Sequence, residues 1–398
     1  MKIYTSKKDV VSQKAIVADD MILTADMPTA AGSKMLDGYK SLFEAEVLTR
    51  LKSAGYELCG KTDVGEFAID LVGETSYNGA NVNDGVLLNP CVEALKSDNL
   101  KGAVCLDVNG SVRRAAAQND MVSVKATYGT VSRYGTIPVA CSGETVSVMA
   151  KSSKDCKDIL DVIVGHDDKD GTSLSEELCD KVKLGEAKLL RVAVIADMEK
   201  GIDADVEERM SAFKSVLRSG GVEVVEINDE VIAASRAAWN VLMSAELCNN
   251  VSRYDGVKYG YRAQSFSGID ELYTNSRTQA FGELLKSAIL FGSDTLSTEN
   301  YMKVYDKALR VRRVVCERFA KIFDSFDAVL IPACSTMSYT ESQIKENKYM
   351  SYEENFYTAP ASISGLPAVV VGGVQLVGKA FSECTLLKAA ELYEKEVK

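Results

Sequence analysis

The chain has 398 residues, 46% of them hydrophobic and 26% charged, which is ordinary for a globular protein and excludes a disordered or low-complexity chain. Its 46 Lys and Arg against 57 Asp and Glu give a net charge of −11, so we expect no direct nucleic-acid binding, because phosphate neutralisation needs clustered cations. The sequence shows no signal peptide and no apolar run of about 18 residues, which predicts a cytoplasmic protein without a membrane span.

Helical and strand patterns alternate through the first half of the chain. Residues 41–56 carry apolar side chains at helical spacing and stop at Gly55, which predicts an amphipathic helix. The apolar run 102–108 indicates a buried strand, and 154–165 a second helix that ends at a glycine.

A strand–helix–strand unit follows. We expect strands at 189–197 and 222–229 with a helix at 206–221 between them, a pattern typical of βαβ units.

The rest of the chain is predicted to be helical first and then to return to strands. A mainly helical insertion spans 231–323, with long periodic stretches at 277–293 and 297–323, and buried strands follow at 327–333 and 367–378. Continuous apolar strands between helices predict an α/β fold with a mixed, mostly parallel twisted sheet covered on both faces. Because no repeat and no Pro- or Gly-rich linker interrupts the chain, we expect a single domain, 1–398.

The metal-binding residue types are scattered. The ten cysteines form no C-x-x-C pair, and His166 is the single histidine, so we predict no metal site and no cofactor. Dispersed cysteines are typical of free thiols in a reducing compartment. His166 lies beside three acids in "GHDDKD", and we expect it to border a loop rather than to act in catalysis.

One short stretch, "CLDVNGSVRR" (105–114), is typical of a nucleophile loop. The Asn109–Gly110 turn presents Ser111 directly after an apolar strand, so Ser111 is the candidate nucleophile. The alternative is a serine that only satisfies hydrogen bonds of the loop.

Seven segments in order resemble the amidase signature family, and specifically its branch formed by the A subunit of glutamyl-tRNA(Gln) amidotransferase. The resemblance implies an α/β/α layered fold and a family role in releasing ammonia from glutamine for Gln-tRNA(Gln) formation. The matching segments are "GKTDVGEFA" (60–68), "NGSVRRAAA" (109–117), "VKATYGTVSRYG" (124–135), "GHDDKDGTS" (165–173), "RYDGVKYGYR" (253–262), "RTQAFGE" (277–283) and "SGLPAVVVGGVQLVGKAF" (364–381).

The resemblance also implies a Ser–Ser–Lys triad, in which neutral lysine takes a proton from the nucleophile through a bridging serine. It places the nucleophile at Ser111 and the lysine at Asp19. The bridging serine falls at Leu87, 24 residues before Ser111, and leucine carries no proton. The resemblance therefore implies that the proton relay is missing.

Substrate-binding positions differ as well. The resemblance implies an oxyanion loop formed by Val108, Asn109 and Gly110, where the family reads T-G-G. The arginine that holds the glutamine carboxylate falls at Ala288, and the aspartate that holds its ammonium group falls at Asn355.

The N-terminus and the segment 253–262 are two further regions to compare with the family. The resemblance implies an N-terminus truncated relative to the family, with about 18 residues before Asp19. "RYDGVKYGYR" is either a contact for a partner or RNA, because Arg and Tyr are favoured at interfaces, or a packed and solvated loop.

Two hypotheses follow. The first is a catalytically inactive paralogue that acts as a scaffold or binding subunit, with a B-subunit-like amidotransferase protein, a true A subunit, or a small-molecule amide or amino acid as its partner. The second is an active amidase in which Ser111 works with a changed base on a changed substrate.

Overall fold

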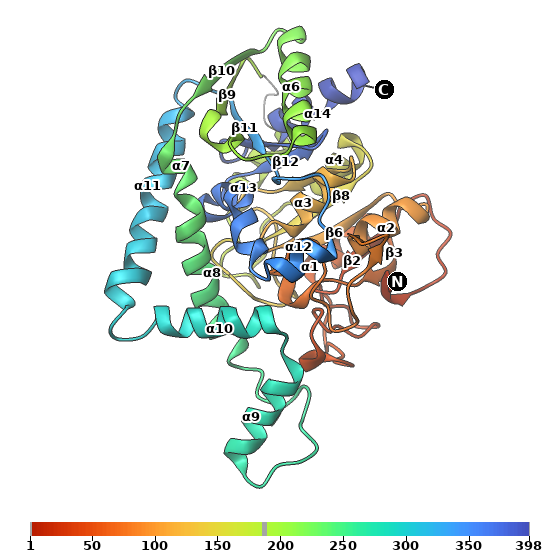
Figure 1. Cartoon of the computed structure of the whole chain (residues 1–398). Coiled ribbons are helices and arrows are strands. Elements are labelled where there is room, and N and C mark those ends of the chain that lie inside the picture. The colour runs from red at the N-terminus through yellow and green to blue at the C-terminus, as the bar shows by residue number, and fades with distance from the viewer. Residues whose placement is uncertain (1, 185–188, 398) are drawn as a thin grey trace.

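The computed structural model describes residues 2–184 and 189–397, and its centre is one large sheet (Figure 1). A short hairpin of β4 (Val82–Asn83) and β5 (Val86–Leu87) lies apart from that sheet. From one edge to the other, the sheet is formed by β1 (Tyr4–Lys7), β3 (Glu57–Thr62), β2 (Ala15–Asp19), β6 (Gly102–Asp107), β8 (Thr145–Ala150), β7 (Val122–Lys125), β12 (Ala368–Val371), β13 (Val374–Gly378), β11 (Ala328–Pro332), β9 (Arg191–Ile195) and β10 (Glu223–Ile227).

The sheet is mixed, with parallel strands in two blocks. β2 pairs in parallel with β3 and β6, and β9 pairs in parallel with β10 and β11. The ladders between these blocks are antiparallel, because β12 and β13 form a hairpin and β8 runs against both β6 and β7. The mixed α/β class predicted from the sequence is confirmed, and parallel pairing prevails within the two blocks.

Both faces of the sheet are covered, so two apolar cores form. Along β2, Ile16 and Ala18 belong to the larger core, whereas Ala15 and Val17 belong to the smaller one. This alternation is the two-residue period of a strand buried on both sides. The helices that supply the cover are α1 (Glu46–Ser53), α2 (Pro90–Ser97), α3 (Ser111–Gln118), α4 (Ser153–Ile163), α5 (Glu176–Leu184), α6 (Ala204–Ser219), α12 (Glu341–Glu346), α13 (Met350–Ser364) and α14 (Glu383–Val397).

The region between β10 and β11 is helical. In Figure 1, α8 and α11 run side by side along one edge of the molecule, α10 crosses below them, and α9 projects outward. The elements are α7 (Glu230–Ala233), α8 (Ser235–Val251), α9 (Ile269–Ala280), α10 (Glu283–Thr295), the π-helix η4 (Tyr301–Tyr305) and α11 (Asp306–Ile322). Short 3₁₀ helices lie elsewhere at η1 (Lys34–Leu36), η2 (Glu66–Ala68) and η3 (Ala196–Glu199).

Several element boundaries differ from the sequence expectation. The predicted periodic stretch 277–293 is divided between α9 and α10, because Phe281 and Gly282 have extended backbone. The first predicted helix starts at Glu46 rather than 41, and Leu42 is 98% exposed because it lies outside the helix. The predicted strand 367–378 is two strands, because Gly372 and Gly373 both have positive φ (59° and 82°) and turn the chain into a hairpin. No helix within the described residues is long and apolar enough to cross a membrane.

Candidate active site

Ser111 is the first residue of α3 and follows the loop that leaves β6. Gly110 precedes it with φ 85°, and a Cβ at that position would lie 2.4 Å from the Cβ of Thr358. The close approach of α13, which carries Thr358, therefore requires glycine at the turn. Ser111 is a buried residue, 6% exposed.

The loop is held by a buried ion pair. Arg113 and Asp107 have fully buried side chains, and the guanidinium donates to both carboxylate oxygens, at 2.8 and 3.1 Å. Burial alone raises the pKa of Asp107, but the facing Arg113 charge outweighs it and holds that pKa below its ordinary value. The ends of β6 and α3 are thus tied together by a charge-assisted bidentate contact.

Arg113 also ties the loop to the C-terminal part of the chain. Its remaining N–H groups donate to Thr358 O at 2.8 Å, Gln375 Oε1 at 2.9 Å and Ser362 Oγ at 2.7 Å. The neighbouring Arg114 is equally buried and donates to Leu71 O, Asp70 O and Thr358 Oγ1. These arginines therefore fix the loop through satisfied hydrogen bonds rather than presenting a free cation.

The Ser111 hydroxyl is different, because its Oγ makes no hydrogen bond to any residue that the structure describes. Asp19, at the end of β2, accepts from Leu106 N at 2.8 Å and Met21 N at 3.1 Å. Burial raises the pKa of Asp19 to about 7, although those two N–H donors act against the shift. Asp19 is therefore a carboxyl group that titrates near neutral pH, and its hydrogen bonds go to the backbone and not to Ser111.

A second buried group with a pKa near neutrality lies close to the loop. Burial, with the Arg113 charge as the next cause, lowers the pKa of Lys125 on β7 to about 7. Its Nζ donates to Leu366 O at 3.1 Å. Like Asp19, Lys125 has no hydrogen bond to Ser111 within the described residues.

Leu87 lies in β5, in an apolar environment. It is 7% exposed and belongs to the same core as Val112, the residue after Ser111. Its N–H donates to Tyr339 O at 2.8 Å, and the Tyr339 hydroxyl donates to Glu354 at 2.6 Å. The segment that follows β11 therefore pairs with β5.

A cluster of buried amides closes the other side. Trp239 Nε1 donates to Asn109 Oδ1 at 3.0 Å, and Asn109 Nδ2 donates to Ile69 O at 2.8 Å. The Asn355 amide faces Asn109 at one end and lies 2.6 Å from Asn240 Oδ1 at the other. Asn109, Asn355 and Trp239 are each at most 1% exposed. Asn109, a candidate oxyanion-loop residue, is therefore engaged by protein groups.

The substrate-binding positions Ala288 and Asn355, and the oxyanion-loop residue Val108, are also closed to solvent. Ala288 lies on the buried face of α10 with no exposed surface, and Asn355 on α13 has none either. Val108 is fully buried in the larger core. The structure thus brings Val108, Asn109 and Gly110 together with Ser111 and Asn355, whereas Asp19 makes its hydrogen bonds to the backbone of β6 and the β2 end.

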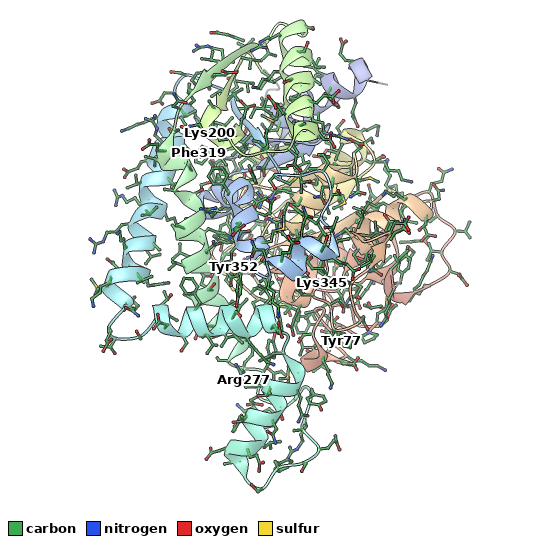
Figure 2. All side chains as sticks on the ribbon, in the orientation of Figure 1. Tyr77, Lys200, Arg277, Phe319, Lys345 and Tyr352 are labelled. Atoms are coloured by element: carbon green, nitrogen blue, oxygen red, sulfur yellow. The ribbon has the colours of Figure 1, made fainter. Side chains whose placement is uncertain are left out.

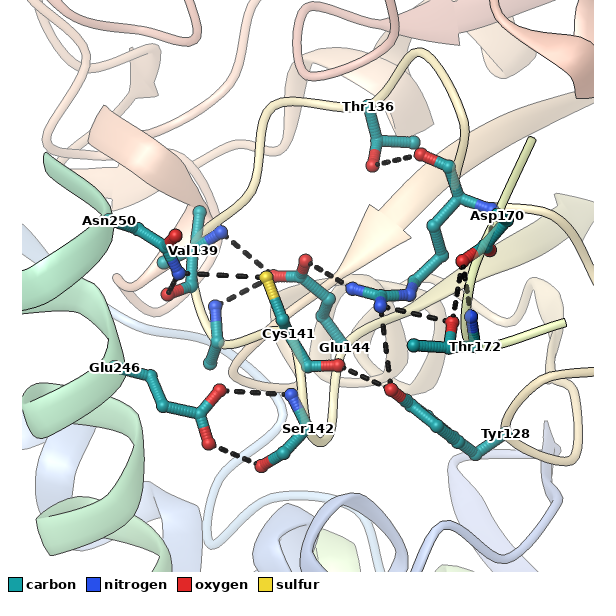
Figure 3. Close-up of polar contacts among 12 residues, drawn as sticks. Tyr128, Thr136, Val139, Cys141, Ser142, Glu144, Asp170, Thr172, Glu246 and Asn250 are labelled. Carbon is teal, nitrogen blue, oxygen red and sulfur yellow. Dashed lines mark hydrogen bonds and ion pairs between the residues drawn. The ribbon is translucent and has the colours of Figure 1, made fainter. Parts of the chain in front are cut away.

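The "VSRYG" segment forms a separate polar cluster (Figure 3). Arg133 donates to Glu144 at 2.8 Å and to Thr172 Oγ1 at 3.1 Å, and Glu144 in turn accepts from the backbone of 139–140. Figure 3 shows Glu246 of α8 facing Ser142, whose N–H donates to it at 2.9 Å. These contacts attach the 139–144 loop to the helical region.

The "RYDGVKYGYR" segment is partly packed and partly exposed. Tyr254 is buried and stacks on Phe67 with ring centroids 5.5 Å apart, and Tyr261 N donates to Met35 O. Lys258 and Tyr259 are exposed. The packed half matches the loop interpretation, and a contact role for the exposed half stays a prediction.

A mixed sheet covered by helices on both faces, with a serine at the start of a helix behind a glycine turn, defines the chain as an α/β protein. The "Amidase" family model matches residues 16–88 and 98–387, and the chain belongs to the amidase family.

Within that family the chain is similar to proteins named as the A subunit of glutamyl-tRNA(Gln) amidotransferase. The one from Lachnoclostridium phytofermentans is 33% identical over 95% of this chain and 82% of its own. The one from Acinetobacter baumannii is 35% identical over 94% of this chain and 80% of its own.

Solved structures agree with the family assignment. The crystal structure of the Thermotoga maritima glutamyl-tRNA(Gln) amidotransferase A subunit has a TM-score of 0.80 at 25% identity, covering 98% of this chain and 87% of that one. The K. lactis urea amidolyase has a TM-score of 0.79 at 20% identity over 95% of this chain and 22% of that one, a likeness of fold alone.

Several residues that build the site were not singled out from the sequence. Arg113 and Arg114 lie inside a quoted motif, but arginine is mostly exposed in proteins, so nothing in the local sequence indicated that both are buried. Trp239 is the single tryptophan of the chain. Nothing in its local pattern connects it with Asn109, which lies 130 residues earlier.

Proposed function

We propose that this chain is a catalytically inactive paralogue of the amidotransferase A subunit that serves as a scaffold or binding subunit. The observation that carries the proposal is the isolation of the Ser111 hydroxyl. No described basic group hydrogen-bonds to this hydroxyl. The position at which the family has its bridging serine is occupied by Leu87, an apolar residue in an apolar core. A serine without an adjacent base is a weak nucleophile.

The two buried groups whose pKa lies near 7, Asp19 and Lys125, have hydrogen-bond partners other than Ser111. Asp19 accepts two backbone N–H groups, and Lys125 donates to a backbone carbonyl. General base catalysis contributes on the order of 10²- to 10⁴-fold and requires the base within hydrogen-bond reach of the proton. Moving either side chain to Ser111 would break these buried hydrogen bonds, which supports the inactive alternative.

The positions at which the family binds the glutamine carboxylate and ammonium groups, Ala288 and Asn355, support the same proposal. Ala288 has no group that could bind a carboxylate, and the Asn355 amide is engaged by Asn240. Because both residues are closed to solvent, glutamine would have to displace packed side chains before it could contact either position.

Ammonia release by the purified protein tests the proposal. Glutamine, asparagine and a panel of simple amides would be supplied, with Ser111→Ala as the matched control. We expect no release above that control from folded protein. The double variant Asp19→Lys with Leu87→Ser should also stay inactive on glutamine, since Ala288 and Asn355 would still fail to hold the substrate.

The second candidate function is an active amidase with a changed base and substrate. The pKa of Asp19 near 7 favours it, because a base is most effective when its pKa lies near the working pH. Release of ammonia that Ser111→Ala removes would establish this alternative and overturn the first. Asp19→Asn would then have to abolish the same release.

A partner protein is part of the proposal. The relatives are named as subunits, so we expect this chain to bind a B-subunit-like amidotransferase protein or an intact A subunit in the cytoplasm. Co-expression followed by size-exclusion chromatography would show a stable complex. Separate elution of both chains at micromolar concentration would contradict it.

A further inference from the structure

A surface cavity of about 550 Å³ lies between α8, α10 and α13, and its Asn240 wall contacts Asn355 of the buried amide cluster beside the Ser111 loop. Its walls are Phe291 of α10 and the rings of Tyr349 and Tyr352 at the start of α13, and Figure 2 shows Tyr352 beside α8 and α10. Asn240 and two small aliphatic side chains of α8 form the rest of the lining together with Ser287. Concave sites with aromatic walls and a few polar groups are typical of small-molecule binding.

The lining of this cavity carries no charged side chain. Three other cavities of the described structure are each lined by several charged residues, for example Lys200 and Arg318, Asp205 and Arg209, or Lys7 and Asp98. An ionic ligand would lose its hydration in the uncharged cavity without gaining an ion pair. The ligand that fits is therefore uncharged.

The aromatic rings are unusually open to solvent for residues of their size. Phe291 is 41% exposed and Tyr349 is 53% exposed, although both line the cavity. The Tyr349 and Tyr352 rings meet edge to face, at 61° and 6.5 Å between centroids. A flat ring placed between Phe291 and Tyr349 would cover this apolar surface and make further aromatic contacts.

Two hydroxyl groups at the cavity have unused hydrogen-bonding capacity. Ser287 Oγ donates to Glu283 O at 3.0 Å, which leaves its lone pairs available as acceptors. The Tyr349 hydroxyl lies 3.4 Å from Ser287 Oγ, a long and weak contact. One ligand hydroxyl placed beside both oxygens can accept from Tyr349 and donate to Ser287.

Asn240 does not select the ligand in the same way. Its Nδ2 donates to Tyr352 O at 3.0 Å, and its Oδ1 is engaged by Asn355. Asn240 instead forms a rigid wall of the cavity and connects it to the buried amide cluster.

We propose that this cavity binds an uncharged monocyclic phenol. The ring lies between Phe291 and Tyr349, and the phenolic hydroxyl accepts from Tyr349 and donates to Ser287. The site does not depend on hydrolysis at Ser111, so it serves a binding subunit and an active amidase alike.

Isothermal titration of the full-length protein with p-cresol tests the proposal. We expect saturable one-site binding, and at least tenfold weaker binding of toluene, which lacks the hydroxyl, cyclohexanol, which lacks the ring, and benzoate, which is charged. Phe291→Ala should weaken p-cresol binding about tenfold, and Tyr349→Phe should remove the preference for p-cresol over toluene. Leu290→Ala is the matched control on α10, since Leu290 is 72% exposed and outside the lining, and it should bind like the unaltered chain.

Any one of three outcomes would overturn the proposal. They are the absence of saturable binding heat for p-cresol up to its solubility limit, binding of benzoate as tight as that of p-cresol, or the same p-cresol affinity for Phe291→Ala as for the unaltered chain. Because Phe291 is half exposed, its substitution should leave the fold intact, which circular dichroism would verify. Ser111→Ala should bind p-cresol unchanged, so a failure here is distinguishable from a failure of the proposed function.

Discussion

The loop after β6 and the hairpin of β4 and β5 adjoin one core but differ in chemistry. In and beside the loop, Asp107 at the end of β6, Asn109, and Arg113 in α3 are buried polar residues with hydrogen-bond partners. In the hairpin, Leu87 is packed among apolar side chains. The loop residues hold β6, α3 and α13 together whether or not Ser111 reacts. The comparison teaches that the residues of a catalytic-type motif can also support the fold. Such a motif can therefore stay recognisable whether or not its serine reacts.

Removing the Arg113 charge should have the largest effect. Arg113→Met leaves Asp107 buried without its partner, so we expect a loss of about 4 kcal/mol of unfolding free energy or failure to fold. Urea unfolding followed by circular dichroism measures it. Arg313→Met, at an 83% exposed arginine of α11, should change stability by less than about 1 kcal/mol. Equal effects of the two variants would show that the loop is not held by this ion pair.

The raised pKa of Asp19 predicts a pH-dependent stability. The folded protein holds the Asp19 proton up to a pKa of about 7, against an ordinary value of 3.8, so the stabilising contribution is present below pH 4 and lost as the pH rises through 7. The difference in stability between the unaltered chain and Asp19→Asn should therefore fall by about 4 kcal/mol across this window. Urea unfolding from pH 4 to 8 measures it.

The control for this pH series is Asp9→Asn, at an exposed aspartate. If the stability difference between the unaltered chain and Asp19→Asn rose with pH, it would contradict the burial of a protonated carboxyl at position 19.

Leu87 offers a test of the apolar side of the comparison. Leu87→Ser removes buried apolar surface and places a hydroxyl in an apolar core, so we expect a loss of about 3 kcal/mol without any gain of amide hydrolysis. Thermal unfolding and ammonia release would be measured together. Leu42→Ser, at a residue that is 98% exposed, should be nearly neutral. Hydrolysis that appears with Leu87→Ser alone would mean that the rest of the relay is intact.

Ser111 should give the smallest effect. Ser111→Ala removes a hydroxyl without a hydrogen-bond partner among the described residues, so stability should change by less than about 0.5 kcal/mol. Ser362→Ala is the matched contrast, because Ser362 Oγ accepts from Arg113 at 2.7 Å, and it should cost about 2 kcal/mol. A loss for Ser111→Ala as large as that for Ser362→Ala would reveal a structural role of Ser111.

The local part of this structure could be predicted from the sequence. Apolar periodicity located β6, β9, α6, β10 and β11 to within a few residues, because local spacing decides which face of an element is buried. The Asn109–Gly110 turn likewise located the loop before Ser111. The partners of Arg113 could not be predicted, because Thr358 and Gln375 are 245 and 262 residues away and nothing local selects them. Side-chain pairing between distant elements is decided by the assembled sheet.

The place of β11 in the sheet has a consequence for how the chain can be divided. β12, β13 and β11, the last three strands of the sequence, lie together between β7 and β9, so the sheet joins them to earlier strands on both sides. Residues 264–270, before and at the start of the projecting α9, are all exposed. A cut there severs the polypeptide and leaves both ladders in place. Two fragments expressed separately are therefore suited to reassembly as a split protein, with β11 and β12 supplying the complementary edges.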